Sequence, residues 1–323
     1  MIYLDNGISV YSGRGYRLDP KRCVRDCINL ISHAHFDHVP SSFNSPAIIC
    51  SDITRSLIEA RTGSSIPCGP CSCETVTLHD SGHVPGSSMF LINGDKRILY
   101  TGDFNTRKKY FSDGAKPVKA DVLIMESTFG REKYVFPPTE EVFGEIKDWI
   151  DDNAARGLNS IIYAYSFGKA QEVISALSGY TVYASRSVIE INRTLGKFDL
   201  DISAMPLPED LKGPDVVVAP SGSRNSPEIK KIFKAGAKSA SVSGWALDDG
   251  HKYAMRVDRA FPLSDHADYS ELIGFVEKVS PDLVFTLHGF DKEFARDIRD
   301  KLDIEAAPLK KRHLSLSNFT GDV

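Results

Sequence analysis

Cysteines are few and long apolar runs are missing. The chain holds 6 cysteines in 323 residues, too few and too scattered for the disulfide framework of a small secreted domain. No stretch approaches the ~20 apolar residues of a membrane-spanning helix. The opening residues, MIYLDNGISV, lack the basic start of a secretory signal. We therefore expect a cytoplasmic protein that does not insert into membranes.

An excess of positive charge is also lacking. Lys and Arg number 39 against 43 Asp and Glu, a net charge of −4, so no global basic field draws the chain to polyanions. Hydrophobic residues make up 41% and charged residues 25%, which is typical of a folded globular protein and excludes disorder. At ~150 residues per domain, the length indicates two domains, or one with an insertion.

The pattern of apolar runs predicts an α/β body interrupted by an α/β insert. Short strands punctuated by Gly, Asn or Asp are expected at 2–4, 8–10, 16–18, 28–31, 47–50, 75–78, 89–92, 97–100 and 122–125, with one helix at 52–61. From Thr139, the expected N-cap of a helix, helices alternate with continuous apolar runs typical of buried parallel strands, at 161–164, 181–183, 216–219 and 240–242. Helices are expected at 169–177, 186–195, 270–279 and 292–302, and a strand at 283–287. The predicted domains are 1–150, 151–247 and 248–323.

The segment HAHFDH, directly after an expected strand, holds four candidate metal ligands: His33, His35, Asp37 and His38. Unpaired imidazoles and carboxylates are expensive to bury, and a divalent cation removes that penalty. In an extended segment His33 and His35 would share one side and bind one ion. Asp37 and His38 would then turn toward a neighbouring site.

Three more candidates follow later strands. His83 stands in SGHVPGSS, Asp103 in YTGDFN and His288 in FTLHGF. Imidazole and carboxylate ligands without thiolates suit Zn(II), with Mn(II) as the alternative.

Together, HAHFDH, GH and TGD resemble the metallo-β-lactamase superfamily, whose fold is a four-layer αββα sandwich with a binuclear metal site at one edge. Glu126 in LIMESTFG, His266 in FPLSDHADY and His288 are similar to motifs A, B and C of the β-CASP nucleases, and IIYAYSFGKAQEVI resembles the start of their inserted α/β domain. The compact length is most similar to the ligase-associated exonucleases and messenger 3′-end processing factors.

The resemblance implies a role for each motif residue. His33, His35 and His83 would hold one Zn(II), while Asp37, His38 and His288 would hold the other. Asp103 would bridge the two ions, which would activate a bridging water and clamp the phosphate. His266 would be the general acid, oriented by Glu126, and Asp37 is counted with these two among the catalytic residues.

Several basic or glycine-containing segments are candidates for binding substrate phosphates. Arg107 and Lys108 follow the Asp103 motif. In the insert, Ser166, Gly168 and Lys169 form one expected strand-to-helix turn, and Ser221 and Gly222 form a second, where free backbone N–H groups favour anions. A structural metal site at Cys68, Cys71 and Cys73 is weighed against reduced surface cysteines.

The resemblance predicts a nuclease that hydrolyses single-stranded RNA or DNA. Cleavage would be exonucleolytic or endonucleolytic, and the process would be RNA processing or DNA repair. Two alternatives stay open: a small-molecule hydrolase acting on a thioester or lactone, and a non-catalytic scaffold of a processing complex. Both a homodimer and processing-complex partners are compatible with the sequence.

Overall fold

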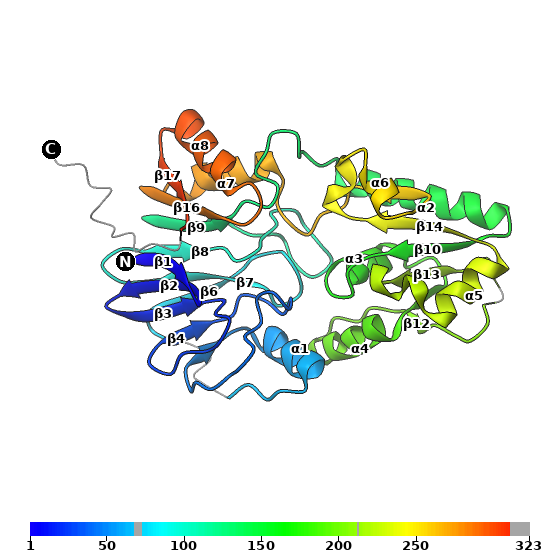
Figure 1. The fold of residues 1–323 in the computed structure, drawn as a ribbon, viewed down its shortest axis with the longest axis horizontal. Helices are drawn as coiled ribbons and strands as arrows, with labels where there is room; N and C mark the ends of the chain where they lie inside the picture. The colour runs from blue at the N-terminus through cyan, green and yellow to red at the C-terminus, as the bar shows by residue number, and fades with distance from the viewer. Residues whose placement is uncertain (68–72, 212, 311–323) are drawn as a thin grey trace. The chain divides into compact units, whose positions relative to one another are not determined.

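The computed structural model describes residues 1–67, 73–211 and 213–310, which form two compact units (Figure 1). The main unit consists of Met1–Val135 together with the chain from His266 onward, and the inserted unit is Phe136–Asp265. The chain therefore leaves the main unit once and returns to it at His266.

Within the described ranges, no helix is both long enough and apolar enough to cross a bilayer.

Two sheets form the main unit. The N-terminal sheet runs in the order β1-β2-β3-β4-β5: Ile2–Asp5, Gly7–Ser12, Arg14–Leu18, Ile28–Leu30 and Ile48–Ile49. The central sheet runs in the order β17-β16-β9-β8-β7-β6: Glu305–Pro308, Leu283–Leu287, Val122–Glu126, Ile98–Tyr100, Ser88–Ile92 and Val76–Asp80.

A buried apolar layer lies between these sheets. Val10, Tyr16 and Leu30 of the N-terminal sheet belong to one core cluster with Phe90 and Ile124 of the central sheet. The other face of the central sheet packs against helices α7 (Tyr269–Val279) and α8 (Asp291–Leu302). This is the predicted metallo-β-lactamase sandwich, with helix α1 (Asp52–Thr62) following β5.

Strand direction brings the ends of several strands to one edge. Strands β8, β9 and β16 are mutually parallel, and β6 runs the same way because it is antiparallel to β7, which is antiparallel to β8. In the other sheet, β3, β4 and β5 are parallel. Residues that follow these strands therefore lie together at the carboxyl ends of the strands. Binding and catalytic sites of α/β proteins commonly lie at these ends.

The inserted unit is built on a six-stranded sheet in which every pairing is parallel, as the continuous apolar runs predict. Its order is β12-β11-β13-β10-β14-β15: Met205–Pro206, Val182–Ala184, Val216–Ala219, Asn159–Tyr163, Ala237–Val242 and Arg259–Phe261. The helices against it are α2 (Thr139–Ala155), α3 (Lys169–Ala176), α4 (Arg186–Leu195), α5 (Pro227–Ala235) and α6 (His251–Ala254).

The inserted unit is wider than the predicted 151–247. Helix α2 contacts β10 and β15, and Trp149 packs on Phe261 with ring centroids 6.0 Å apart, so both flanks belong to it. The predicted cap of α2 is wrong. Pro138 takes the N-cap position without a side-chain capping bond, and Thr139 is already the first residue of the helix.

Candidate metal centre

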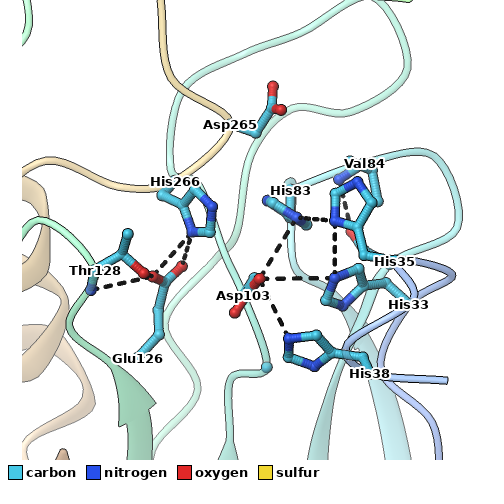
Figure 2. A network of polar contacts seen from close by, with 12 residues as sticks. His33, His35, His38, His83, Val84, Asp103, Glu126, Thr128, Asp265 and His266 are labelled. Atoms are coloured by element: carbon cyan, nitrogen blue, oxygen red, sulfur yellow. Dashed lines mark hydrogen bonds and ion pairs between the residues drawn. The ribbon is translucent and has the colours of Figure 1, made fainter. Parts of the chain in front are cut away.

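Four side chains of the main unit converge on one point (Figure 2). His33 and His35 follow β4, His83 follows β6 and Asp103 follows β8. His35 Nδ1 lies 3.1 Å from Nε2 of both His33 and His83. Asp103 Oδ2 lies 3.7 Å from each of those two Nε2 atoms. We call these four residues the first donor group.

The spacing of the first donor group fits a metal ion. Zinc–nitrogen bonds of ~2.0–2.1 Å place neighbouring donors of a tetrahedral site about 3.3 Å apart. The observed separations of 3.1 and 3.7 Å bracket this value. His33 and His83 are fully buried, and a cation would satisfy their nitrogens where water cannot reach. The imidazole and carboxylate donors are those that zinc accepts.

A second donor group shares Asp103 with the first. It consists of His38, Asp103 and His288, whose ligand atoms lie within 4.8 Å of one another. His38 Nε2 is 3.5 Å from Asp103 Oδ2. His288 follows β16 with a φ of +61°, which is rare for a non-glycine residue, and its carbonyl accepts a 2.7 Å hydrogen bond from Ser127 Oγ. The backbone around His288 is thus held in a strained conformation that points to function.

Asp37 does not join either group in the structure. The HAHFDH segment is extended only at its start, because the His38 N–H donates to the His35 carbonyl at 3.0 Å and closes a turn. This agrees with the expectation that the chain turns after His35, and His38 then faces a second group of donors. The turn leaves the Asp37 side chain 79% exposed, with its Oδ2 3.8 Å from His38 Nε2.

Asp19, which the sequence analysis missed, orients His38. It follows β3, and its Oδ2 lies 2.7 Å from His38 Nδ1. Oδ2 also accepts the Tyr100 hydroxyl at 2.7 Å, and the carboxylate accepts both the N–H and the hydroxyl of Ser32. With Nδ1 held in this way, Nε2 of His38 faces Asp103, an arrangement common behind metal ligands.

Replacing Asp19 with asparagine should lower zinc affinity by ~10–10²-fold, the usual effect of losing such a partner. The amide brings an N–H₂ group among the donors of Tyr100 and Ser32 and removes the charge that supports His38. Competition with a chromophoric chelator measures the change. Asp303→Asn, at another positive-φ aspartate of the main unit, is the control, and equal affinities would contradict the role of Asp19.

Burial and neighbouring charges set the protonation of the donors. Burial, followed by the charges of nearby histidines, lowers the pKa of His33 well below its ordinary value, so its imidazole stays neutral and offers a lone pair. Burial opposes the charge on His38 too, but the carboxylates of Asp103 and Asp19 raise its pKa to about 10. Binding a cation at His38 Nε2 therefore displaces a proton.

Buried Glu126 pairs with partly exposed His266 beside the donor groups (Figure 2). His266 Nδ1 lies 2.8 and 2.9 Å from the two carboxylate oxygens of Glu126, which ends β9. Burial would raise the pKa of Glu126, but the charge and hydrogen bond of His266, with bonds from Thr128 and the Phe104 N–H, lower it. The carboxylate is therefore charged and fixes Nδ1 as the protonated nitrogen that donates to it.

Two buried or half-buried cations fix the backbone of the ligand loops. Lys109 Nζ donates to the His83 carbonyl at 2.9 Å. Arg61, in the last turn of α1, donates to the Ala34 carbonyl and lies 4.0 Å above the Phe36 ring centroid. Helix α1 thereby holds the HAHFDH turn, a role that sequence spacing gives no sign of.

Close backbone packing also fixes the His83 loop. Gly82 has a φ of +65°, and a Cβ there would lie 2.3 Å from the Asn105 carbonyl oxygen. Only glycine allows this approach between the His83 loop and the loop after Asp103.

The predicted phosphate-binding residues of the main unit lie in different surroundings. Arg107 pairs with Asp268 and Glu271 at 2.7 and 2.8 Å and is 24% exposed. Lys108 is 82% exposed and lies 3.7 Å from Asp113. Lys108 is therefore open to a ligand, whereas the Arg107 guanidinium is bound to two carboxylates of the protein.

In the inserted unit, one of the two predicted turns is satisfied internally. Lys169 is buried and its Nζ lies 2.9 Å from Asp265 Oδ2. The Gly168 N–H donates to Gln171 Oε1 at 2.7 Å, and Gln171 donates to the Ser166 carbonyl. The Lys169 ammonium and the Gly168 N–H are thus bound to groups of the protein itself. Ser221 and Gly222 are exposed at the start of a 3-10 turn, Ser221–Asn225, so phosphate binding there stays a prediction.

The predicted cysteine site lies largely outside the described residues, since Cys68 and Cys71 fall in the gap 68–72. Cys73 is described, and its Sγ is 3.1 Å from Thr75 Oγ1.

Residues 252–307 match the RMMBL family, a Zn-dependent metallo-hydrolase RNA specificity domain. The matched segment contains both His266 and His288 with helices α7 and α8. It therefore includes the histidine of the Glu126–His266 pair and one member of the second donor group.

Two relatives of known name resemble most of the chain. A probable DNA ligase of Opitutus terrae is 37% identical over 290 residues, which cover 84% of this chain and 28% of the ligase. Cleavage and polyadenylation specificity factor subunit 3 of Dictyostelium discoideum is 26% identical over 279 residues, 68% of this chain and 36% of that protein. The chain thus spans only a part of each of these longer relatives.

A solved structure shares the fold over the whole chain. The crystal structure of a protein of unknown function from Enterococcus faecalis V583 matches with a TM-score of 0.62 and 13% sequence identity, over 97% of this chain and 98% of that one.

Proposed function

This chain belongs to the β-CASP family of the metallo-β-lactamase superfamily, and on that premise we propose that it is a metal-dependent nuclease. Its substrate would be single-stranded RNA or DNA. The observation that carries the proposal is the convergence of two donor groups sharing Asp103 with a histidine–carboxylate pair beside them.

We propose two zinc ions, with manganese as the alternative. The first donor group would hold one ion and the second donor group the other, with Asp103 between them and Asp37 completing the second set from the solvent side. Bound divalent cations would supply an activated water and neutralise charge on the phosphoryl oxygens. The support lies in donor chemistry and in spacings close to the edge of a coordination tetrahedron.

His266 would supply the proton that the leaving oxygen needs. Its Nδ1 is engaged by both oxygens of Glu126, so its Nε2 is the nitrogen able to give up a proton to substrate. The imidazole lies beside the first donor group, with its ring centroid 4.7 Å from that of His83. Glu126 favours the charged imidazole and restricts its rotation, which are the two properties a general acid requires.

Two other functions receive less support. A thioester or lactone hydrolase of the same superfamily does not require an inserted unit as large as Phe136–Asp265. A non-catalytic scaffold does not require a buried carboxylate paired with a histidine, such as Glu126 with His266, next to the donor groups. We further propose that the protein acts in the cytoplasm, as a homodimer or within a processing complex.

One gel assay tests the proposed function. Metal-loaded protein is expected to cleave end-labelled single-stranded RNA or DNA, and dialysis against a chelator should abolish cleavage until Zn(II) or Mn(II) is returned. Laddering from one end would indicate exonuclease action, and a discrete internal cut endonuclease action. Turnover of a thioester or lactone without cleavage of either nucleic acid would overturn the proposal.

A further inference from the structure

The loop after Asp103 is bonded directly to the segment that carries His266. The Ala267 N–H donates to the Phe104 carbonyl at 2.8 Å, and the Asn105 side-chain amide donates to the His266 carbonyl at 3.0 Å. On its other side, the Phe104 N–H donates to Glu126 Oε1 at 2.9 Å. We call residues 104–107 and 266–268, with these bonds, the acid junction.

Arg107 closes the acid junction at one end. Its Nη2 lies 2.7 Å from Asp268 Oδ2 and its Nε 2.8 Å from Glu271 Oε1. Its own N–H donates to Asn105 Oδ1 at 2.7 Å, which aims the Asn105 amide at the His266 carbonyl. Arg107 thus binds Asp268 and Glu271 through its side chain and orients Asn105 through its backbone N–H.

The two carboxylates that bind Arg107 also begin helix α7. Asp268 Oδ1 accepts the Glu271 N–H at 2.9 Å, while Glu271 Oε2 accepts the Asp268 N–H at 2.8 Å, a reciprocal capping box. Each carboxylate therefore uses one oxygen for the helix and the other for Arg107. The first turn of α7, two residues beyond His266, is bound to the Asp103 loop by a planar fork that lysine does not possess.

We propose that Arg107 is a positioning residue: by joining the Asp103 loop to the start of α7, it fixes His266 relative to the metal-binding carboxylate. This replaces the predicted contact with substrate phosphate, because two carboxylates within 2.8 Å offset the guanidinium charge. The inference rests on the proposed function for its catalytic part. Its structural part, the junction itself, is independent of that function.

Arg107→Lys and Asp268→Asn test the proposal through kinetics. Lysine keeps the positive charge and loses the fork, and asparagine removes the ion pair while remaining a good N-cap. Each variant should lower kcat by ~10–10²-fold, the cost of a small misplacement of a reacting group, with KM for the oligonucleotide and metal content unchanged. The double variant should be no slower than the slower single one, because the two residues act as a unit.

Amide hydrogen exchange gives a readout that does not depend on activity. The Ala267 amide should exchange faster in Arg107→Lys than in the wild type, because its bond to Phe104 is no longer supported. Lys96→Gln is the matched control. It removes the exposed Lys96–Asp282 ion pair of the main unit and should change neither kcat nor Ala267 exchange.

The outcomes separate the two proposals. Wild-type kcat in Arg107→Lys, or a raised KM with kcat unchanged, would overturn the positioning role, since charge alone would then suffice. If the wild type cleaves no nucleic acid, the proposed function fails. In that case faster Ala267 exchange in Arg107→Lys still supports the junction, and unchanged exchange overturns it.

Discussion

Replacing His266 with alanine is expected to lower kcat by ~10²–10⁴-fold while the proposed metal ions stay bound, because a general acid contributes a factor of this size to proton transfer. In the proposed mechanism Glu126 holds Nδ1 and thereby orients the imidazole as a proton donor. Single-turnover cleavage of end-labelled RNA or DNA, combined with elemental analysis, measures both quantities.

The metal analysis is essential to this test. Asp103, Glu126 and His266 also bring ligand atoms within 4.8 Å of one another, so His266 has the geometry to be a ligand as well. Loss of an ion in His266→Ala would assign it to the metal site and contradict its role as acid. Glu126→Gln is the companion variant, expected to keep its metals and to show a smaller loss, because the amide still orients the imidazole without favouring its charge.

Replacing Asp103 with alanine should reduce cleavage to the level of the no-enzyme control and lower the metal content from the proposed two ions to at most one. Asp103 takes part in both donor groups, with its Oδ2 between 3.5 and 3.7 Å from His33, His38 and His83. No other described residue belongs to both groups. Burial raises the pKa of Asp103. The charge of His38 opposes this rise, and the charge of Glu126 adds to it. A bound cation would offset the cost of keeping this buried carboxylate charged.

Thermal unfolding with and without zinc checks the same variant independently. A ligand that binds only the folded state raises its stability, so zinc should raise Tm in the wild type by more than in Asp103→Ala. Asp282→Asn, at an exposed carboxylate of the main unit, should behave as the wild type. Equal metal content in Asp103→Ala and the wild type would show that the bridging position has been assigned wrongly.

Sequence reasoning was accurate where a segment is buried throughout. The buried strands include Val122–Glu126, Val216–Ala219 and Leu283–Leu287. Continuous apolar runs in the sequence predict them. The strands β12 and β17 were missed because they are short, contain proline and are partly exposed. The local residue pattern does not predict β12 and β17. They form because they pair with the neighbouring strands β11 and β16.

For the site, chain motifs predicted the residues but not what holds them. His33, His83, Asp103 and His288 stand after strands and carry metal-binding chemistry, so position and residue type agree. Asp19 is a single carboxylate whose role depends on β3 lying parallel to β4, a fact of topology. The strand-to-helix turn at Lys169 predicts a phosphate ligand. Its partner in the structure, Asp265, is 96 residues away in the sequence, so the local pattern does not reveal this ion pair.

Asp19 has a consequence for how this site can change over evolution or in the laboratory. Its carboxylate accepts hydrogen bonds from Ser32, which follows β4, and from Tyr100 of β8, so it is attached to both layers of the sandwich at once. A substitution that shifts one layer against the other, even one made deep among apolar side chains, would rotate His38 and alter how tightly an ion is held. Transplanting the ligands to a new scaffold would therefore require the two facing sheets to be transplanted with them.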